Sequence, residues 1–144
     1  MPLLTAKVPN LQASGPVIEV LIALSTTLRK ILEEQKQPIP QPVKKIMLID
    51  TGASASAIKT GIARDLDLTP HGTITISTAS HRDVVCPTYD VDIIFQLQRV
   101  IVPNVRVFES NFEEQAIDGL IGRDILSRGI LVYTGYDNSF TLGF

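Results

Sequence analysis

The chain has 144 residues, of which 44% are hydrophobic and 19% are charged, and its formal net charge is −2 at pH 7. This composition is too apolar for a disordered protein, and the slightly acidic balance gives no reason to expect a nucleic acid as a partner. A chain of this length is expected to form one domain over residues 1–144, with a single hydrophobic core.

The sequence indicates neither a membrane span nor a metal site. No apolar run approaches the length of a spanning helix, and the amino terminus lacks the pattern of a secretory signal, so we expect a cytoplasmic protein without a membrane partner. Cys86 is the only cysteine and is expected to be a buried structural thiol. Together with His71 and His81 it forms no zinc-ligand spacing, so no metal or other cofactor is expected.

The first part of the chain predicts a strand, a helix and a stiff connector. Residues 2–15 alternate apolar and polar positions among Pro, Asn and Gly, which leaves an edge strand and a loose arm both open. Residues 16–23 are rich in β-branched side chains and predict a strand. Ser25 can cap a helix after it, whose apolar residues at helical spacing are Leu24, Leu28, Ile31 and Leu32. Three prolines within residues 35–42 then predict a polar connector.

The middle of the chain predicts a second strand and a short helix. Residues 44–49 form the strand, which ends directly at Asp50. Apolar residues then recur at intervals of four, at Ile58, Ile62 and Leu66, and predict a helix that Pro70 stops.

The rest of the chain is dominated by predicted strands. Residues 73–78, 84–95 and 100–108 are rich in Val, Ile, Thr and aromatic side chains, with polar turns between them. Residues 123–128 predict one or two helical turns, and residues 130–144 predict a terminal hairpin. Several strands with short turns and brief helices indicate a mainly β domain with a closed or sandwiched sheet.

Asp50 lies at the end of an apolar strand, where burying an unpaired carboxylate costs free energy. Asp50 follows four apolar residues, and a carboxylate beside buried apolar groups must find hydrogen bonds or share a proton. Gly52 lets the backbone turn so that its amide can approach a carboxylate oxygen. Thr51 offers a hydroxyl to a partner across an interface.

These residues carry a resemblance to a known family. Asp50-Thr51-Gly52-Ala53-Ser54 resembles the signature of aspartic proteases, and Leu120-Ile121-Gly122-Arg123-Asp124 resembles the apolar-apolar-Gly element of the retroviral branch. A single acid motif in a chain of this length is similar to the retropepsins, whose subunits form homodimers, and bacterial stand-alone members are the nearest kind. The resemblance implies a retropepsin-like closed β-barrel, the acid protease fold, with an insertion at about residues 24–42.

The resemblance also implies a mechanism and a set of site residues. A dimer would bring two copies of Asp50 together, so that the pair shares a proton and activates water against a peptide bond of a peptide or protein substrate. Thr51 would lock the two loops together, and Gly52 would line the cleft. The residues that the resemblance implies for substrate binding are Ala53, Leu120, Ile121 and, on a flap-like hairpin, Ser77, Thr78, Ala79, Ser80 and His81.

Some positions depart from the family pattern. Ala53 replaces a Ser or Thr of pepsin-like motifs, so a hydrogen bond to the ionised acid pair is missing and the working pH is expected to move upward. Ser54 replaces an acid that pairs with the Arg of the second element in viral enzymes, so Arg123 is expected to find another partner, either Asp118 or Asp124. The apolar terminal hairpin is expected to build the dimer interface.

A second reading of the same motif stays open. A noncatalytic dimeric β module could use the same groove to bind a peptide or a partner protein, because Asp and Gly are also common in structural turns. Loss of cleavage with retention of the dimer after Asp50→Asn distinguishes an enzyme from such a module.

Overall fold

The computed structural model of the protein describes residues 1–77, 82–112 and 115–144. Its strands are β1 (Leu3–Lys7), β2 (Val17–Leu24), β3 (Val43–Ile49), β4 (Ala57–Lys59), β5 (Thr73–Ile76), β6 (Val84–Phe95), β7 (Val100–Ser110), β8 (Gly119–Ile121), β9 (Ile130–Thr134) and β10 (Ser139–Gly143). Its helices are α1 (Leu11–Ser14), α2 (Thr26–Glu34), α3 (Ile62–Asp65) and α4 (Arg123–Leu126), with a 3-10 turn, η1 (Gly135–Asp137).

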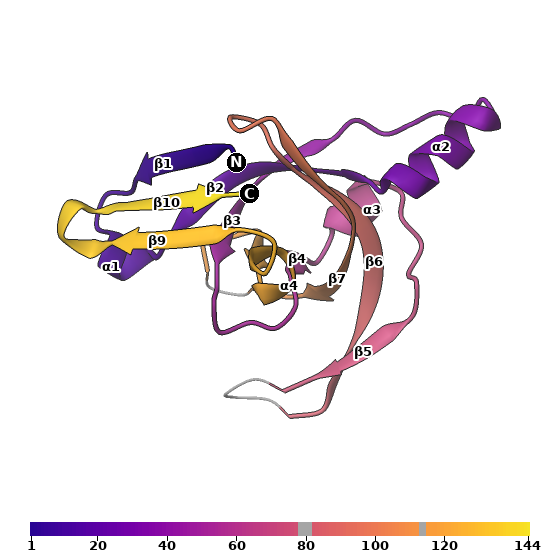
Figure 1. The fold of residues 1–144 in the computed structure, drawn as a ribbon. Coiled ribbons are helices and arrows are strands. Elements are labelled where there is room, and N and C mark those ends of the chain that lie inside the picture. Colours follow the sequence, from indigo (N-terminus) through magenta and orange to yellow (C-terminus); the bar gives the residue numbers. More distant parts are fainter. Residues whose placement is uncertain (78–81, 113–114) are drawn as a thin grey trace.

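Six of these strands close into a barrel (Figure 1). The strands follow one another in the order β2, β3, β8, β4, β7 and β6, and β6 returns to pair with β2, with Leu21 opposite Ile94 and Leu24 opposite Val91. Closure pairs the main-chain groups that an open sheet would leave free at its edges. The prediction of a mainly β domain with a closed sheet is confirmed.

The interior of the barrel is filled by the apolar runs that predict its strands. Seven of the side chains without exposed surface come from β2, β3, β6, β7 and β8: Val20, Ile22, Met47, Val91, Ile93, Val107 and Ile121. Burying one such side chain contributes about 1.5–3 kcal/mol to folding. The β-branched residues are suited to this interior because their stiff side chains pack well on a pleated sheet.

A buried carboxylate fixes α2 to the barrel. Asp92 on β6 has no exposed surface, and its Oδ1 accepts hydrogen bonds from the N–H groups of Thr26 and Asn104, each at 2.9 Å. Its Oδ2 accepts a bond from the Thr26 hydroxyl at 2.6 Å. These bonds offset the cost of burying a charge. Ser25 caps the helix as predicted, since its side chain accepts the N–H of Leu28 at 3.2 Å.

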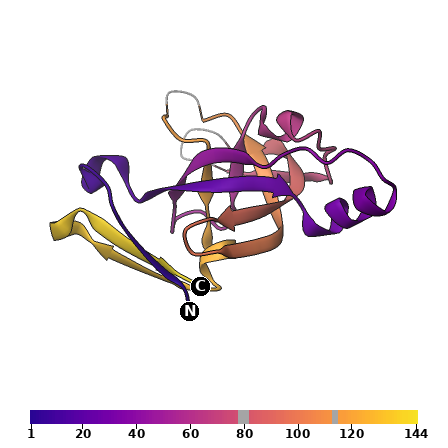
Figure 2. The same cartoon turned by 90° about the horizontal axis from the view of Figure 1, so that it is seen from above.

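The chain termini form a second, three-stranded sheet in the order β1, β10, β9. Residues 3–7 are therefore an edge strand and not a loose arm, and the predicted terminal hairpin is confirmed. Phe140 and Leu142 on β10 are fully buried against the core, whereas Leu3 and Val132 on the other face are 58% and 50% exposed. Figures 1 and 2 place this sheet and α2 on opposite sides of the barrel.

The helix predicted around Ile58 was wrong in its first half. Ile58 lies in β4, where it pairs with Glu109 of β7 and Gly119 of β8, and the helix α3 begins only at Ile62. The apolar spacing of four residues fits both a continuous helix and a strand followed by a helix, because Ile58, Ile62 and Leu66 are all buried in the observed arrangement. Among the residues that the structure describes, no helix has the length and apolar character needed to cross a membrane.

Candidate active site

The loop between β3 and β4 holds Asp50 in a defined orientation. The N–H of Asp50 donates to the carbonyl of Ile121 at 2.9 Å, which continues the pairing of β3 with β8 by one residue. Its carboxylate Oδ1 accepts the N–H of Gly52 at 2.8 Å, and its carbonyl accepts the N–H of Ala53 at 3.2 Å. A Cβ on residue 52 would lie 3.1 Å from Oδ1, so glycine suits this close turn. The carboxylate is partly exposed and aimed by the main chain around it.

A second segment, at the junction of β8 and α4, crosses this loop at very short range. A Cβ on Gly122 would lie 2.7 Å from the carbonyl carbon of Ala55 and 3.0 Å from the carbonyl oxygen of Ala53. Backbone atoms cannot move aside as the end of a flexible side chain can, so the crossing requires glycine. The N–H of Arg123 donates to the carbonyl of Ala53 at 2.9 Å and joins the two segments.

Ser56 and Asp124 connect the same two segments by side-chain hydrogen bonds. Ser56 is completely buried, and its hydroxyl donates to Asp124 Oδ1 at 2.7 Å and accepts the N–H of Gly122 at 2.9 Å. Asp124 Oδ2 accepts the N–H of Ser56 at 2.9 Å, and Oδ1 also accepts the N–H of Ile125. Sequence reasoning missed Ser56, although a serine directly before the apolar pair Ala57-Ile58 is a signal of a hydroxyl that becomes buried and needs a partner.

The prediction that Arg123 pairs with Asp118 or Asp124 was wrong. The Arg123 Nη1 donates to the main-chain carbonyl of Thr51 at 2.7 Å, and not to either of the two acids proposed from the sequence. Asp124 accepts from the Ser56 and Ile125 amides, and Asp118 accepts the N–H of Ile46 at 2.9 Å. The guanidinium therefore holds the Asp50 loop through a main-chain carbonyl and not through an acidic side chain.

The residues proposed to bind substrate fall in three different environments. Ala53 and Leu120 are partly exposed beside the loop, and Leu120 packs on a small cluster that contains Ala57, Phe112 and Ile117. Ile121 has no exposed surface, so its side chain belongs to the core and cannot reach a substrate. Ser77 is exposed at the end of the first strand of the hairpin. Thr78, Ala79, Ser80 and His81 lie outside the described residues.

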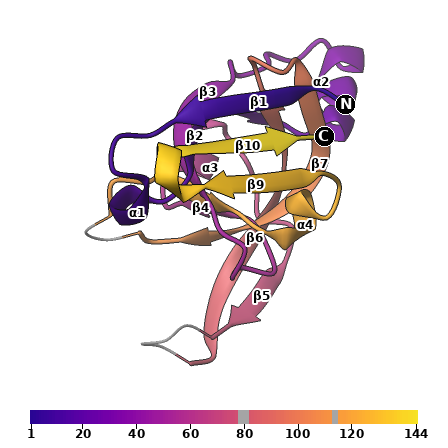
Figure 3. The same cartoon turned by 60° about the vertical axis from the view of Figure 1, so that its left-hand side comes forward.

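A small hollow lies between the Asp50 loop and the base of the β5–β6 hairpin. Its volume is about 210 Å³, and it is lined by Ala55, His71, Gly72, Thr73, Ile74, Thr88, Arg106 and Phe108. Figures 1 and 3 show the β3–β4 loop and the hairpin on the same side of the barrel. The hollow is thus a place where a side chain could sit beside the loop and under the hairpin.

Titratable side chains of strand β6, Asp90 and Cys86 among them, have shifted pKa values. Two hydrogen bonds from the Arg106 guanidinium, at 2.9 and 3.1 Å, hold the pKa of Asp90 below its ordinary value of 3.8. Desolvation, with a smaller contribution from Glu109, raises the pKa of Cys86, so this thiol stays protonated, as expected of a buried structural cysteine. Within the described ranges, no three His, Cys, Asp or Glu side chains gather as metal ligands would.

Comparison with known proteins identifies the family. The family described as "gag-polyprotein putative aspartyl protease" matches residues 41–128, more than half of the chain and the whole of both segments that form the site. The chain belongs to this family of aspartyl proteases. The crystal structure of a retropepsin-like aspartic protease from Rickettsia conorii superposes with a TM-score of 0.50 at 17% identity, covering 90% of this chain and 93% of that one. The predicted retropepsin-like fold is confirmed. No curated protein matches the sequence significantly.

Proposed function

We propose that the protein is an aspartic endopeptidase that works as a homodimer, in which two copies of Asp50 activate a water molecule against a peptide bond. The observation that carries this proposal is the Asp50 carboxylate, held by the Gly52 amide at 2.8 Å on a partly exposed loop that a second segment braces. The bond from Gly52 alone is also found in structural turns, but the close crossing by the Gly122 segment gives this loop a second support. Membership of the aspartyl protease family supports the same conclusion.

The chemistry requires a second acid. Amide hydrolysis by water needs a base that takes a proton from water and an acid that polarises the carbonyl oxygen, and one carboxyl group cannot do both at once. Two carboxyls close together share one proton, because both cannot ionise, and so supply the two roles. No covalent intermediate and no cofactor are required.

The second acid is proposed to come from a partner subunit. Asp118 and Asp124, which flank the crossing segment, are both occupied by main-chain amides of this chain. A twofold axis through the loop would bring the two copies of Asp50 together and would also bring the exposed Thr51 hydroxyls within reach of the opposite loop. Ala53, which has no hydroxyl, would leave the acid pair more readily protonated and would favour work at mildly acidic to neutral pH.

The outer face of the terminal sheet is the proposed dimer surface. Leu3, Ile130 and Val132 are 58%, 44% and 50% exposed on this face, and the register places Leu3 and Ile130 on either side of Gly143. Such an apolar face is unfavourable in water and is suited to a subunit contact. Because β1 pairs with β10 of its own chain, each subunit would contribute a whole three-stranded sheet, and the two sheets would meet at their outer faces.

The substrate is proposed to be an extended peptide segment. It would lie between the Asp50 loops and the β5–β6 hairpins, with side chains directed at the 210 Å³ hollow and at Leu120. An extended strand satisfies its own main-chain groups against neighbouring backbone, which suits a cleft bordered by strand β5 and a loop.

Substitution of the proposed acid tests the enzyme reading. A peptide library incubated with the wild-type protein at mildly acidic and neutral pH should give products, and Asp50→Asn should abolish them while leaving the dimer and the thermal midpoint intact. Asp65→Asn, an exposed change of the same kind on α3, is the control and should cleave normally. Adding an excess of Asp50→Asn subunits to wild-type protein should lower activity below the level set by dilution, because mixed dimers would hold one acid. A verified dimer that gives no Asp50-dependent product would favour a binding module.

The subunit contact has its own test. Val132→Asp places a charge on the outer face of the terminal sheet and should shift the sedimentation coefficient from dimer to monomer. Cleavage should then be lost at low protein concentration and partly return at high concentration, because dissociation follows mass action. Tyr136→Asp, at a residue that is 96% exposed in the adjoining turn, is the control. A dimer unchanged by Val132→Asp would place the interface elsewhere.

A further inference from the structure

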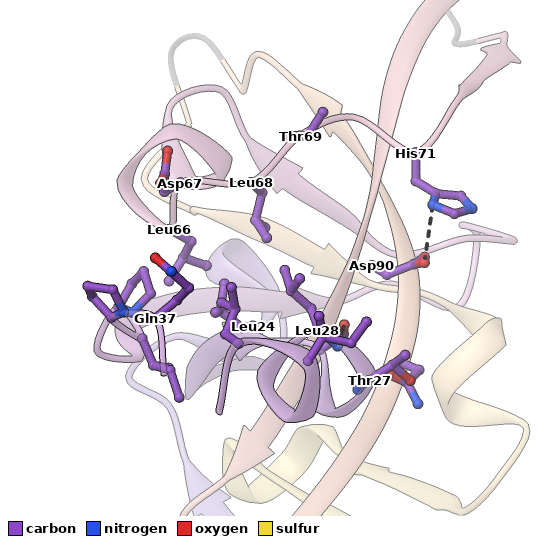
Figure 4. A pocket seen from close by; sticks show the side chains of 17 residues that line it. Leu24, Thr27, Leu28, Gln37, Leu66, Asp67, Leu68, Thr69, His71 and Asp90 are labelled. Carbon is purple, nitrogen blue, oxygen red and sulfur yellow. Dashed lines mark hydrogen bonds and ion pairs between the residues drawn. The ribbon is translucent and has the colours of Figure 1, made fainter. Parts of the chain in front are cut away.

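An apolar groove lies beside α2, and no residue of the Asp50 loop lines it (Figure 4). It has a volume of about 800 Å³ and runs between α2, the proline-containing connector and the segment that follows α3. Its apolar lining includes Leu24, Leu28, Ile31, Leu32, Leu66 and Leu68, together with residues of the connector. Leu24 and Leu66 are buried at its floor, at 2% and 0% exposure.

Helix α2 carries more apolar surface than the barrel covers. None of its residues is fully buried, and Ile31 is 44% exposed although it lines the groove. Leu28 and Leu32, one turn apart on the same face, are only partly buried. The helix thus presents one apolar wall to the groove, and polar groups such as Thr27, Thr69 and Asn104 stand at its rim. An apolar floor with a polar rim suits an apolar side chain on a chain whose backbone stays near water.

The groove and the hollow beside the Asp50 loop border each other. His71 lines both cavities. Asp90 lines the groove and Arg106 lines the smaller hollow, and these two side chains are joined by two hydrogen bonds. His71 Nδ1 lies 3.9 Å from Asp90 Oδ2, as the dashed line in Figure 4 marks. A peptide that passes Ala55 beside the hairpin would meet His71 and the Asp90–Arg106 pair next, and α2 lies on the far side of these residues.

We propose that the α2 groove is a substrate exosite, which binds an apolar residue in the flank of the peptide whose scissile bond lies between the two Asp50 carboxyls. This inference rests on the proposed function. The groove stays open in the proposed dimer, because α2 lies on the opposite side of the barrel from the terminal sheet (Figures 1 and 2). Twofold symmetry gives each end of a bound peptide one such groove. An apolar residue is therefore expected to bind on either side of the scissile bond.

Leucine scanning of a cleaved peptide tests the exosite. A short peptide that the wild-type enzyme cleaves is lengthened at both ends with a Ser-Gly extension, and one leucine is moved through successive positions of each extension. At one position on each side, leucine should raise kcat/KM by about tenfold, mainly by lowering KM, because the side chain adds binding energy without touching the reacting atoms. The short peptide and the all-polar extension should be cleaved at equal rates.

Groove variants complete the test. Ile31→Ser, at a partly exposed position, should remove the preference for leucine and leave cleavage of the short peptide unchanged. Leu97→Ser, at an 83% exposed residue in the β6–β7 turn, is the matched control and should keep the preference. If the short peptide is cleaved but no leucine position matters, or if Ile31→Ser keeps the preference, the exosite is overturned and the protease stands. If no peptide is cleaved in an Asp50-dependent way, the proposed function fails and the exosite fails with it.

Discussion

The floor of the candidate active site, which is formed by the Asp50 loop and the Gly122 segment, is tightly packed, whereas the β5–β6 hairpin is loosely packed. In the floor, the Asp50 loop and the Gly122 segment approach so closely that no Cβ fits, and a buried Ser56 and Asp124 join them by hydrogen bonds. The hairpin has little packing, since Ile74 is 37% exposed and Val85 is 64% exposed. In the proposed protease the acids must keep their positions while the hairpin must admit and release a substrate. The closely packed part thus holds the acids proposed to react, and the hairpin proposed to move has many exposed side chains.

The largest expected effect comes from adding one methyl group to the floor. Gly122→Ala forces its Cβ against the backbone of Ala55 at 2.7 Å and should lower the free energy of unfolding by about 3 kcal/mol. Urea unfolding followed by circular dichroism measures this change. Gly135→Ala is the control, because its Cβ would meet only the ring of Tyr133 at 3.2 Å and the ring can shift. Equal stability of the two variants would contradict the close crossing.

A smaller effect is expected from the polar link in the floor. Asp124→Asn keeps the shape of the side chain but turns an amide NH₂ toward a donor, so one of the groups on Ser56 or Ile125 loses its acceptor. The free energy of unfolding should fall by about 2 kcal/mol. The exposed Asp65→Asn should change it by less than about 0.5 kcal/mol. A result for Asp124→Asn as small as that of the control would mean that these bonds do not hold the floor together.

At the junction of hairpin and barrel, the effect should depend on pH. Arg106 keeps the pKa of Asp90 below 3.8 in the folded protein, so this ion pair stabilises the fold above that pH and its contribution is lost as the pH falls through the folded pKa. Arg106→Ala should therefore lower stability at about pH 5 and converge with the wild type in stronger acid. Thermal midpoints over this range measure the convergence, with the exposed Arg128→Ala as control. A pH-independent difference would show that the arginine acts through packing alone.

The smallest effect is expected in the hairpin itself. Val85→Thr keeps the β-branched shape at a residue that is 64% exposed and should change the free energy of unfolding by less than about 0.5 kcal/mol. The same change at Val107, which has no exposed surface on β7, should cost about 2 kcal/mol because it buries a hydroxyl. If both variants lost stability equally in urea titrations, the hairpin would be packed as tightly as the barrel, and the contrast drawn above would fail.

Much of the fold followed from local patterns. The β-branched runs predicted β2, β6 and β7 because alternation and side-chain stiffness are properties of neighbouring residues. Ser25 predicted the start of α2 for the same reason, since a cap bonds to an amide three residues away. The helix expected at Ile58 failed because an apolar interval of four fits a buried strand followed by a turn of helix as well as one continuous helix. Pairing with β7 and β8 decided between them.

By itself, the sequence determined an acid at the end of a buried strand, the glycine beside it and the family motifs around both, because these depend on residues next to one another. Only the tertiary structure decided that Arg123 binds the carbonyl of Thr51, that Ser56 bonds to Asp124, and that α2 borders an apolar groove. The physical reason is separation along the chain. The two bonded pairs lie 72 and 68 residues apart, and many side chains could satisfy the same donor, so the closure of the barrel selects the one that does.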